Sequence, residues 1–415
     1  MVKITNFPFL YGPEFEGERI RAEDLYIQFG GRTSSMVEWV TTLACEEITD
    51  GKIELFGPDI QDCAIGDTLP LAIIIEVAGK NMQPDFEPVL EKQIHRILNR
   101  TKGVMHTGQR DMGHIKVSKS VALKGFSLRH IGAILYEKLH NDYERIIDKT
   151  QVKIYTDAKK AAEILNKARP IYAERDARVE GITDEGVDTF YSCTICQSFF
   201  PFHVCTISPQ RSSPCGSYSW LDCKAAYEIE PTGPNKPILK QKMLDSNLGQ
   251  WQGINNFVKA ASQGKMNCYN LYDIMEKPMP TSEWVECVSV VLPQCNGIMI
   301  ADKDYNGMTP CGMDFKTIID NIKGELDIPG FMGHSRYNIV QDKFIFAEGG
   351  VQRIVWMPLA LKKWICDNFG RRGKGPEIIG MLDKIADESI GTDEESVLAF
   401  LKAAGHPALL MEAII

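Results

Sequence analysis

The chain has 415 residues, more than one compact core usually takes, so two or three domains are expected. Its 44% hydrophobic and 24% charged residues are typical of globular proteins and exclude a disordered chain. The formal net charge of −9 argues against a general nucleic-acid-binding protein, and no nucleic-acid partner is expected.

Neither a membrane span nor a secretion signal is predicted. The longest apolar run, Leu69–Ile75, is far shorter than the roughly 20 residues that cross a bilayer. The first 20 residues contain no apolar signal core. We therefore expect a cytoplasmic protein with no membrane partner. Its twelve cysteines are then expected to be reduced thiols, metal ligands or core residues, not disulfides.

The N-terminal part of the chain predicts an α/β layer domain of residues 1–187. A turn at Gly30 and Gly31 is expected to precede a helix at about 36–48. The apolar pattern then predicts strands and helices in the order strand, strand, helix, helix, strand, helix. These elements are expected at 53–60, 69–78, 84–100, from Ser127 onward, at 152–155 and from Asp157 onward.

A second domain of residues 188–415 is expected, because the composition changes near Asp188. Prolines, glycines and cysteines are dense up to about residue 240, which indicates loops around a site. Further on, the sequence predicts strands at 297–301, 344–346 and 351–356, and helices at 358–369 and 394–404. The fold class is therefore α/β (α+β): two α/β layer domains, the second wrapped around a cluster-binding loop.

Four cysteines in this loop predict a metal centre. Cys193 and Cys196 are separated by two residues, Cys205 follows after eight more, and Cys215 after nine. Thiolates bind both iron–sulfur clusters and zinc. A zinc ribbon usually has two Cys-x2-Cys knuckles, whereas this loop has one, so the spacing favours iron–sulfur over zinc or unrelated core cysteines. His203, between two of the cysteines, is expected to be a packed or hydrogen-bonded residue.

The loop resembles the A-cluster loop of the carbon monoxide dehydrogenase/acetyl-CoA synthase family. The resemblance begins with the string Cys193-Thr-Ile-Cys-Gln-Ser-Phe-Phe-Pro-Phe-His-Val-Cys205 and continues at Cys215-Gly and Ser219–Asp222. It extends through further long strings and covers essentially all of 188–415, and the preceding domain more faintly. These strings are Asn296–Ile300, Gly307–Met313, Pro329–Gly333, Arg353–Pro358 and Gly405–Ala408.

The resemblance implies a [4Fe-4S] cubane held by the four cysteines. In the family, the thiolate at the position of Cys196 bridges the cubane to a nickel. The resemblance also implies the short, archaeal-type form of the acetyl-CoA synthase (beta) subunit, which lacks the large N-terminal dehydrogenase-docking domain. Subunits of this kind would bind a corrinoid protein or another protein of anaerobic one-carbon metabolism.

The sequence departs from the family at the nickel chelate. A Cys-Gly-Cys tripeptide is expected after the string Met275-Glu-Lys-Pro-Met279, but a count without gaps finds Ser282, Glu283 and Trp284 there. A hydroxyl is a poor ligand for a soft nickel–sulfur site, and an indole is none. Nickel is therefore not expected. The alternative is a rearranged nickel site that uses one of four other thiols, Cys223, Cys287, Cys295 or Cys311.

A basic stretch in the first domain predicts an anion or partner site. The sequence from Lys92 to Arg129 contains nine basic residues and one acid, Asp111. A glycine-containing loop at 106–114 lies in its middle and offers backbone donors. By resemblance, coenzyme A phosphates could bind this domain through Arg96, Arg100, Arg110 and Lys116. The alternatives are a solvated basic face or a docking surface for an acidic protein, since no Walker or G-x-G-x-x-G motif is present.

Three functions remain open at this point. The first is a nickel-free [4Fe-4S] relative that acts as a redox or accessory protein in one-carbon and corrinoid metabolism. The second is a CO-methylating acetyl-CoA synthase with a modified metal site. The third is a non-catalytic assembly subunit whose cluster is only structural. Whether the protein is an enzyme depends on its nickel content.

Overall fold

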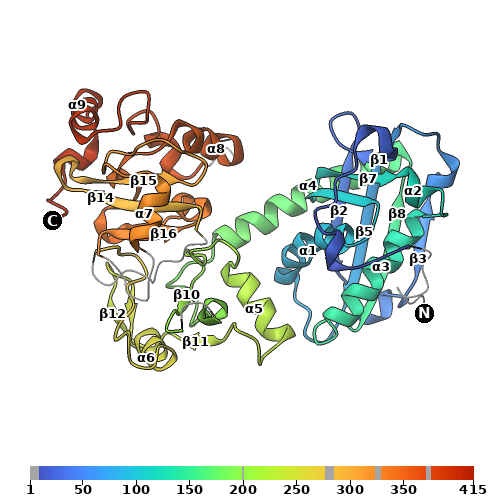
Figure 1. Cartoon of the computed structure of the whole chain (residues 1–415). Helices are drawn as coiled ribbons and strands as arrows, with labels where there is room; N and C mark the ends of the chain where they lie inside the picture. Colours follow the sequence, from blue (N-terminus) through green and yellow to red (C-terminus); the bar gives the residue numbers. More distant parts are fainter. Residues whose placement is uncertain (1–8, 199–200, 276–284, 323–328, 371–374) are drawn as a thin grey trace. The chain divides into compact units, whose positions relative to one another are not determined.

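The structure is a computed structural model of the whole chain and describes residues 9–198, 201–275, 285–322, 329–370 and 375–415 (Figure 1). Its mixed strands and helices are those of an α/β protein. Contacts divide the chain into two units, which we describe separately. The first comprises Met1–Gly181 with Glu228–Glu230, and the second comprises Ile182–Tyr227 with Pro231–Ile415. The expected boundary at 187/188 stays a prediction.

The first unit contains two four-stranded sheets. One has the order β4-β1-β7-β6, with β4 at Asp67–Leu69, β1 at Leu25–Gly30, β7 at Met112–Ser118 and β6 at Val104–Gln109. The other has the order β2-β5-β8-β3, with β2 at Met36–Thr42, β5 at Leu71–Ala78, β8 at Lys149–Tyr155 and β3 at Ile53–Phe56. Parallel and antiparallel pairs occur in both sheets, so both are mixed.

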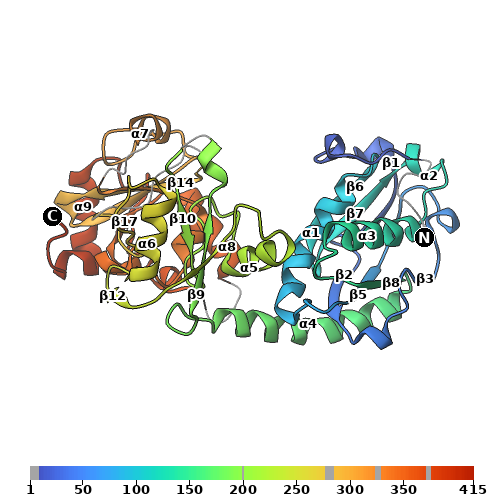
Figure 2. The same cartoon turned by 90° about the horizontal axis from the view of Figure 1, so that it is seen from below.

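Three long helices cover the second of these sheets. Helices α1 (Glu87–Asn99) and α3 (Leu128–Asp142) pack on one face, and α4 (Ala158–Glu180) packs on the other (Figure 2). The pleat explains this division, because successive side chains of a strand point to opposite faces. In β8, Ile154 lies against Gly132 of α3, whereas Tyr155 packs with the buried side chains of α4.

Six predicted elements of the first unit are present and one was wrong, whereas the strands β1, β6 and β7 were not predicted. The helices expected from Ser127 and Asp157 are present and each begins with a side-chain cap: Ser127 Oγ accepts from Arg129 N at 3.0 Å, and Asp157 Oδ1 accepts from Lys160 N at 2.9 Å. The predicted helix at 36–48 is instead the strand β2, which pairs in parallel with β5 from Met36 onward. A short apolar run fits a buried strand as well as a helix, and here the sheet decides.

The second unit is built on the sheet β16-β14-β15-β17. Its strands are β14 (Cys287–Leu292), β15 (Gly297–Asp302), β16 (Phe331–His334) and β17 (Ile354–Trp356). One face packs against α8 (Leu359–Phe369), and the other packs against α7 (Phe315–Ile322) and α9 (Glu394–Ala404). The predicted helices at 358–369 and 394–404 and the strand at 297–301 are confirmed. The strand predicted at 344–346 is wrong, because Ile345 has a φ of 44° and opens a 3-10 turn at Phe346–Glu348.

Smaller elements surround the cysteine loop. They are β9 (Thr189–Cys193), β10 (Cys205–Ile207), α5 (Trp220–Ile229), β11 (Pro237–Leu239), β12 (Met243–Asp245), β13 (Gln250–Trp251) and α6 (Gln252–Ala261). Strand β9 is central in the sheet β10-β9-β11.

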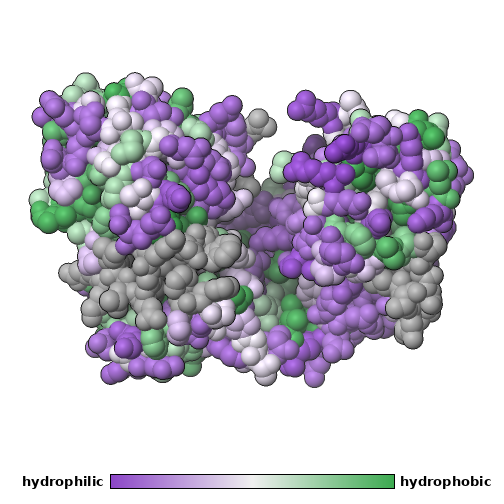
Figure 3. Space-filling view, in the orientation of Figure 1, coloured by the Kyte–Doolittle hydropathy of each residue, from purple (hydrophilic) through white to green (hydrophobic). Residues whose placement is uncertain are grey.

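The surface drawn in Figure 3 is mostly hydrophilic, and its hydrophobic residues lie in small separate patches. Within the described residues, no helix combines the length and apolar character that crossing a membrane requires.

Candidate metal centre

The small sheet brings two of the four cysteines opposite each other. Cys193 is the last residue of β9 and Cys205 is the first residue of β10, and the two are register partners in an antiparallel pair. Directly paired residues have Cβ atoms about 4.5–5.5 Å apart and point to the same face. Cys196 follows in the 3-10 turn Ile195–Ser198, and Cys215 lies in the loop before α5.

The four thiols are close enough to influence one another electrostatically. Burial raises the pKa of Cys205 well above its usual value, and the neighbouring Cys193, Cys215 and Cys196 raise it further. Burial also raises the pKa of Cys193 to about 11, again with Cys215 and Cys196 contributing. Four thiolates crowded together are unfavourable without a cation, and bound iron would offset this cost.

Hydrogen-bond donors surround these sulfurs. His203 Nε2 lies 2.9 Å from Cys205 Sγ, and Ser213 Oγ lies 3.4 Å from Cys215 Sγ. The backbone N–H of Ile195 bonds to Cys193 and lowers the pKa of its thiol. Burial lowers the pKa of His203 to about 4, so its imidazole is neutral and can donate one N–H to sulfur. The structure thus gives His203 the hydrogen-bonding role expected from the sequence.

Thiol ligands of this kind are used by both iron–sulfur clusters and zinc. Within the described residues, no group of three or more His, Cys, Asp or Glu side chains is placed as one metal ion would require. A zinc ion needs four sulfurs about 2.3 Å from one point. A cubane instead takes each thiolate on a different iron, so its ligands stand further apart. Four mutually interacting thiols with N–H and O–H donors are compatible with the [4Fe-4S] cluster expected from the sequence, which stays a prediction.

Aromatic residues pack around the thiols. Tyr191, Tyr218 and Trp220 lie in the same cluster of packed side chains as Cys193 and Cys205. The indole N–H of Trp220 donates to the carbonyl of Thr189 at 2.9 Å and so fixes the start of α5 against β9. The same cluster contains a fifth cysteine, Cys223 of α5. Sequence reasoning considered this thiol as a core cysteine or a substitute nickel ligand, because sequence spacing did not show that α5 returns to the loop.

The segment expected to carry the nickel chelate, Ser282, Glu283 and Trp284, lies outside the described residues. The thiols weighed as substitutes are described. Cys287 donates to Asp302 Oδ2 at 3.4 Å, and Cys295 donates to the carbonyl of Glu394 at 3.6 Å. Cys311 Sγ lies 3.3 Å from Thr309 Oγ1.

The four basic residues proposed from the sequence are placed in different surroundings. Arg96 and Arg100 both pair with Glu16, each at 3.4 Å. Arg110 pairs with Glu91 at 3.0 Å and with Asp176 at 2.8 Å. A phosphate would have to compete with these carboxylates. Lys116 alone of the four lines the large pocket of this unit.

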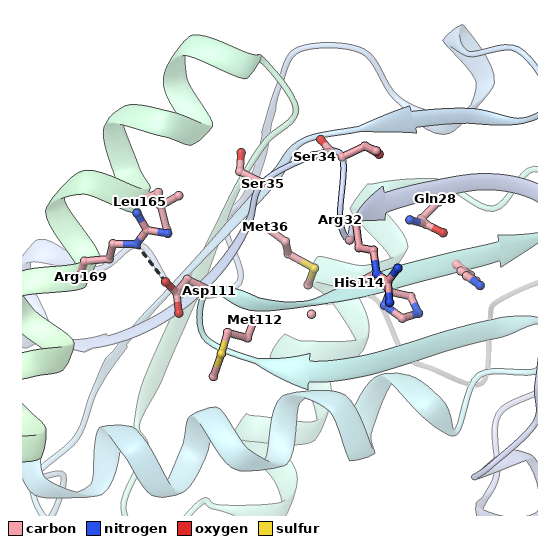
Figure 4. Close-up of a pocket in the computed structure, with 14 residues that line it drawn as sticks. Gln28, Arg32, Ser34, Ser35, Met36, Asp111, Met112, His114, Leu165 and Arg169 are labelled. Atoms are coloured by element: carbon pink, nitrogen blue, oxygen red, sulfur yellow. Dashed lines mark hydrogen bonds and ion pairs between the residues drawn. The ribbon is translucent and has the colours of Figure 1, made fainter. Parts of the chain in front are cut away.

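This pocket has a volume of about 800 Å³ and lies between the β1–β2 turn, β7 and α4 (Figure 4). Arg32 and His114 stand on one side of it, and Arg169, paired with Asp111 at 3.0 Å, stands on the other. Positive φ angles at Gly30 and Gly31 shape the turn. Within the described residues, neither Arg32 nor Lys116 has an ion-pair partner. Sequence reasoning missed Arg32, although it directly follows the glycine pair that it had marked as a turn.

Comparisons with known proteins agree with the resemblance seen in the sequence. The family model for the C-terminal part of the ACS/CODH beta subunit matches residues 172–415, and the model for the CO dehydrogenase/acetyl-CoA synthase complex beta subunit matches residues 7–161. The carbon monoxide dehydrogenase/acetyl-CoA synthase subunit alpha of Moorella thermoacetica is 47% identical over 100% of this chain and 57% of its own length. The chain thus spans little more than half of that relative.

Two archaeal relatives are covered more fully. The acetyl-CoA decarbonylase/synthase complex subunit beta of Methanopyrus kandleri is 39% identical over 99% of this chain and 86% of its own length. Subunit beta 2 of the corresponding complex of Methanocaldococcus jannaschii is 38% identical over 97% of this chain and 83% of its own length. A solved C-terminal domain of an acetyl-Coenzyme A synthase alpha subunit is 47% identical, covers 32% of this chain and 97% of that domain, and has a TM-score of 0.28.

Proposed function

The chain belongs to the family of CO dehydrogenase/acetyl-CoA synthase complex beta subunits, and on this basis we propose that it is a nickel-free [4Fe-4S] member of that family. Its proposed role is that of a redox or accessory subunit in one-carbon metabolism, next to a corrinoid protein or another protein of such a complex. Support for the cluster comes from the four thiols at Cys193, Cys196, Cys205 and Cys215 and from the donors around them.

One observation carries the nickel-free part of the proposal. Ser282, Glu283 and Trp284 stand where the resemblance calls for Cys-Gly-Cys. Two thiolates are replaced by a hydroxyl and an indole, which are unsuitable for a soft metal. Glu283 also removes the glycine that would let the backbone fold tightly around the ion.

The other thiols of this unit support the same proposal. Cys287 and Cys295 are fully buried and hydrogen-bonded to protein oxygens, as core cysteines are. For either thiol to bind nickel, its hydrogen bond would have to break and its strand or turn would have to move. A structural role for these cysteines requires neither change.

A bound cubane would supply one-electron transfer, and the chain would hold and tune it. Cys193 and Cys205 are 6% and 5% exposed, so the loop keeps water away from their side of the cluster. His203 Nε2 is placed to donate to Cys205, and Ser213 Oγ to Cys215. Such donors stabilise thiolate charge and help set the reduction potential.

Metal analysis of protein purified without oxygen tests this function. We expect about four irons, matching sulfide and no stoichiometric nickel, before and after incubation with nickel under reducing conditions. The same samples should not exchange labelled carbon monoxide into acetyl-CoA. Stoichiometric nickel together with exchange would establish the acetyl-CoA synthase instead. One zinc without sulfide would remove the cluster.

The pocket of the first unit favours a second, binding function. We propose that it receives phosphate groups, with coenzyme A as the ligand that the family suggests. Within the described residues, Arg32 and Lys116 have no ion-pair partner, while Asp111, which also lines the pocket, pairs with Arg169. Ser34 and Ser35 line the same pocket. A volume of about 800 Å³ is within the range of ligand pockets.

A further inference from the structure

The pocket of the first unit has two polar sides with an apolar part between them (Figure 4). Arg32 and His114 stand on one side, and the pair of Asp111 and Arg169 stands on the other. Two thioether side chains lie between these sides, those of Met36 and Met112. A ligand that fills the pocket therefore needs a group for the cations, an apolar middle part and a polar edge for the Asp111–Arg169 pair.

The first side suits an anion. His114 and Lys116 are two residues apart on β7, so their side chains point to the same face of the sheet. Gln28 of β1 is the register partner of Lys116 and lines the pocket as well. Within the described residues, neither Lys116 nor Arg32 is paired with a carboxylate. A phosphate bound here would not have to displace an acid.

Asp111 is the only acid among the described residues that line the pocket. It would repel a phosphate placed beside it. Its Oδ2 accepts from Arg169 Nε at 3.0 Å, and its other carboxylate oxygen has no hydrogen-bond partner within the described residues. The pair thus offers an acceptor beside guanidinium donors. Adenine, the base of coenzyme A, presents an amino donor beside ring-nitrogen acceptors, which matches this arrangement.

The two thioethers suit the face of an aromatic base. Met36 is 3% exposed and belongs to the floor of the pocket, whereas Met112 is 72% exposed. A thioether makes favourable contacts with aromatic rings and adapts its shape to them. A flat base placed here would cover part of the apolar surface that Met112 presents to water, and this burial favours binding.

The turn that presents Asp111 and Met112 is held in place. Arg110, directly before them, has a φ of 55° in the hairpin between β6 and β7. Its guanidinium pairs with Glu91 at 3.0 Å and with Asp176 at 2.8 Å. These ion pairs fix the hairpin tip, so the side of the pocket that would receive the base is formed before a ligand binds.

We propose that this pocket selects an adenine nucleotide, whose base lies on the two thioethers with its polar edge at the Asp111–Arg169 pair, and whose phosphate lies beside the cations on the other side. The inference rests on the phosphate pocket of the proposed function. It adds the residues that would recognise the base, and coenzyme A is one ligand of this class.

The test measures binding of three probes to the full chain by calorimetry at low salt. The probes are AMP, ribose 5-phosphate, which lacks the base, and purine riboside 5-monophosphate, which lacks only the amino group. All three carry the same phosphate monoester. The variants are Met112→Ser and Asp111→Ala. The control, Leu123→Ser, changes another exposed apolar side chain of this unit, 77% exposed, that does not line the pocket.

We expect the unmodified protein to bind AMP about tenfold more tightly than either other probe, because ring burial and a hydrogen bond to a charged group each contribute at this level. Met112→Ser should weaken AMP binding and leave ribose 5-phosphate unchanged. Asp111→Ala should abolish the preference for AMP over purine riboside 5-monophosphate without weakening ribose 5-phosphate, since it removes an acceptor and a negative charge. Leu123→Ser should alter none of these affinities.

Equal affinities for AMP and ribose 5-phosphate in the unmodified protein would overturn the inference and leave the phosphate site in place. A full preference for AMP in Met112→Ser or in Asp111→Ala would overturn it too. Loss of ribose 5-phosphate binding in both variants would show a distorted pocket and not base recognition, and would likewise overturn it. If neither the probes nor coenzyme A binds at low salt, the phosphate pocket of the proposed function fails, so the two failures are distinguishable.

Discussion

Cys193 and Cys205 face each other as register partners at the ends of two antiparallel strands, β9 and β10. Eleven residues separate them in the sequence, and the loop between them contains Cys196 and His203. Backbone pairing thus places two of the proposed ligands, while the loop places a third. The fourth, Cys215, comes from the segment that leads into α5.

Removal of Cys205 should abolish the cluster and destabilise its loop. Cys205 is 5% exposed and makes the hydrogen bond with His203, so Cys205→Ala leaves three ligands and a buried imidazole without its partner. We expect the iron content and visible absorbance to be lost, with a lower midpoint of thermal unfolding. Cys295→Ala, a buried thiol away from the loop, should keep its iron. Full iron content in Cys205→Ala would contradict the ligand assignment.

A buried ion network should stabilise the first unit. Arg175 pairs with Glu87 and, at 3.0 Å, with Glu91, and it donates to the carbonyl of Val40 at 2.9 Å. Arg175→Ala would leave two buried carboxylates without this partner, which costs about 3–5 kcal/mol of the free energy of unfolding. The control is Arg178→Ala, which breaks a more exposed pair with Asp85 and should cost about 0–1 kcal/mol. Urea unfolding followed by circular dichroism measures both, and equal costs would argue against a stabilising network.

Glu348 should make the second unit less stable as the pH rises. Burial, with a contribution from Asp273, raises the pKa of Glu348 to about 9. The folded state therefore keeps the proton of Glu348 at pH values above 4.5, the ordinary pKa at which the unfolded state releases it. From this group alone, the free energy of unfolding falls between about pH 4.5 and pH 9.

Glu348→Gln should remove this part of the pH dependence, since an amide can still donate toward Asp273 and accept from Ile274 N. Urea unfolding at pH 5 and pH 8 measures the free energy of unfolding, and Glu395→Gln, at an exposed position, is the control. If Glu348→Gln and the unmodified protein lose the same stability between pH 5 and pH 8, the carboxyl of Glu348 ionises normally.

The pocket of the first unit should bind coenzyme A through its phosphates. Arg32→Ala and Lys116→Ala should each weaken binding by about 1.5–3 kcal/mol, the usual contribution of a hydrogen bond to a charged group. Binding should also weaken as salt rises, because exposed charges are screened. Calorimetry with coenzyme A and with inorganic phosphate measures both effects.

Arg96→Ala is the matched control for the pocket, because Arg96 pairs with Glu16 and does not line it. It should leave the affinity unchanged. Equal losses in the three variants would indicate a diffuse basic face, and no binding at low salt would leave the partner-docking alternative.

Local patterns predicted the long helices, whereas one error comes from long-range pairing and another from a local backbone conformation. Caps at Ser127 and Asp157 mark helix starts within a few residues, so α3 and α4 could be predicted. The strand β2 could not, because its neighbour β5 begins about thirty residues later and only their pairing distinguishes it from a helix. Isoleucine rarely adopts a left-handed backbone conformation, so the sequence does not predict the one found at Ile345.

The candidate site shows the same division. Close spacing predicted the four cysteines as one centre. The basic residues were predicted by charge alone, and charge in the sequence does not show which carboxylates lie nearby. In the fold, Arg100 pairs with Glu16 and Arg110 pairs with Glu91. Neither carboxylate is adjacent to its arginine in the sequence. Arg32, outside the basic stretch, lines the pocket with Lys116.

Restoration of the chelate should give the protein a nickel site. The triple variant Ser282→Cys, Glu283→Gly and Trp284→Cys returns two soft thiolates and the glycine between them, while the cluster cysteines stay unchanged. We expect this variant to bind nickel after incubation under reducing conditions, where the unmodified protein binds none. Glu283→Gly alone, which frees the backbone without adding a thiolate, is the control and should remain nickel-free. Equal nickel in the unmodified protein and the triple variant would mean that other thiols, such as Cys287, complete a site without this tripeptide.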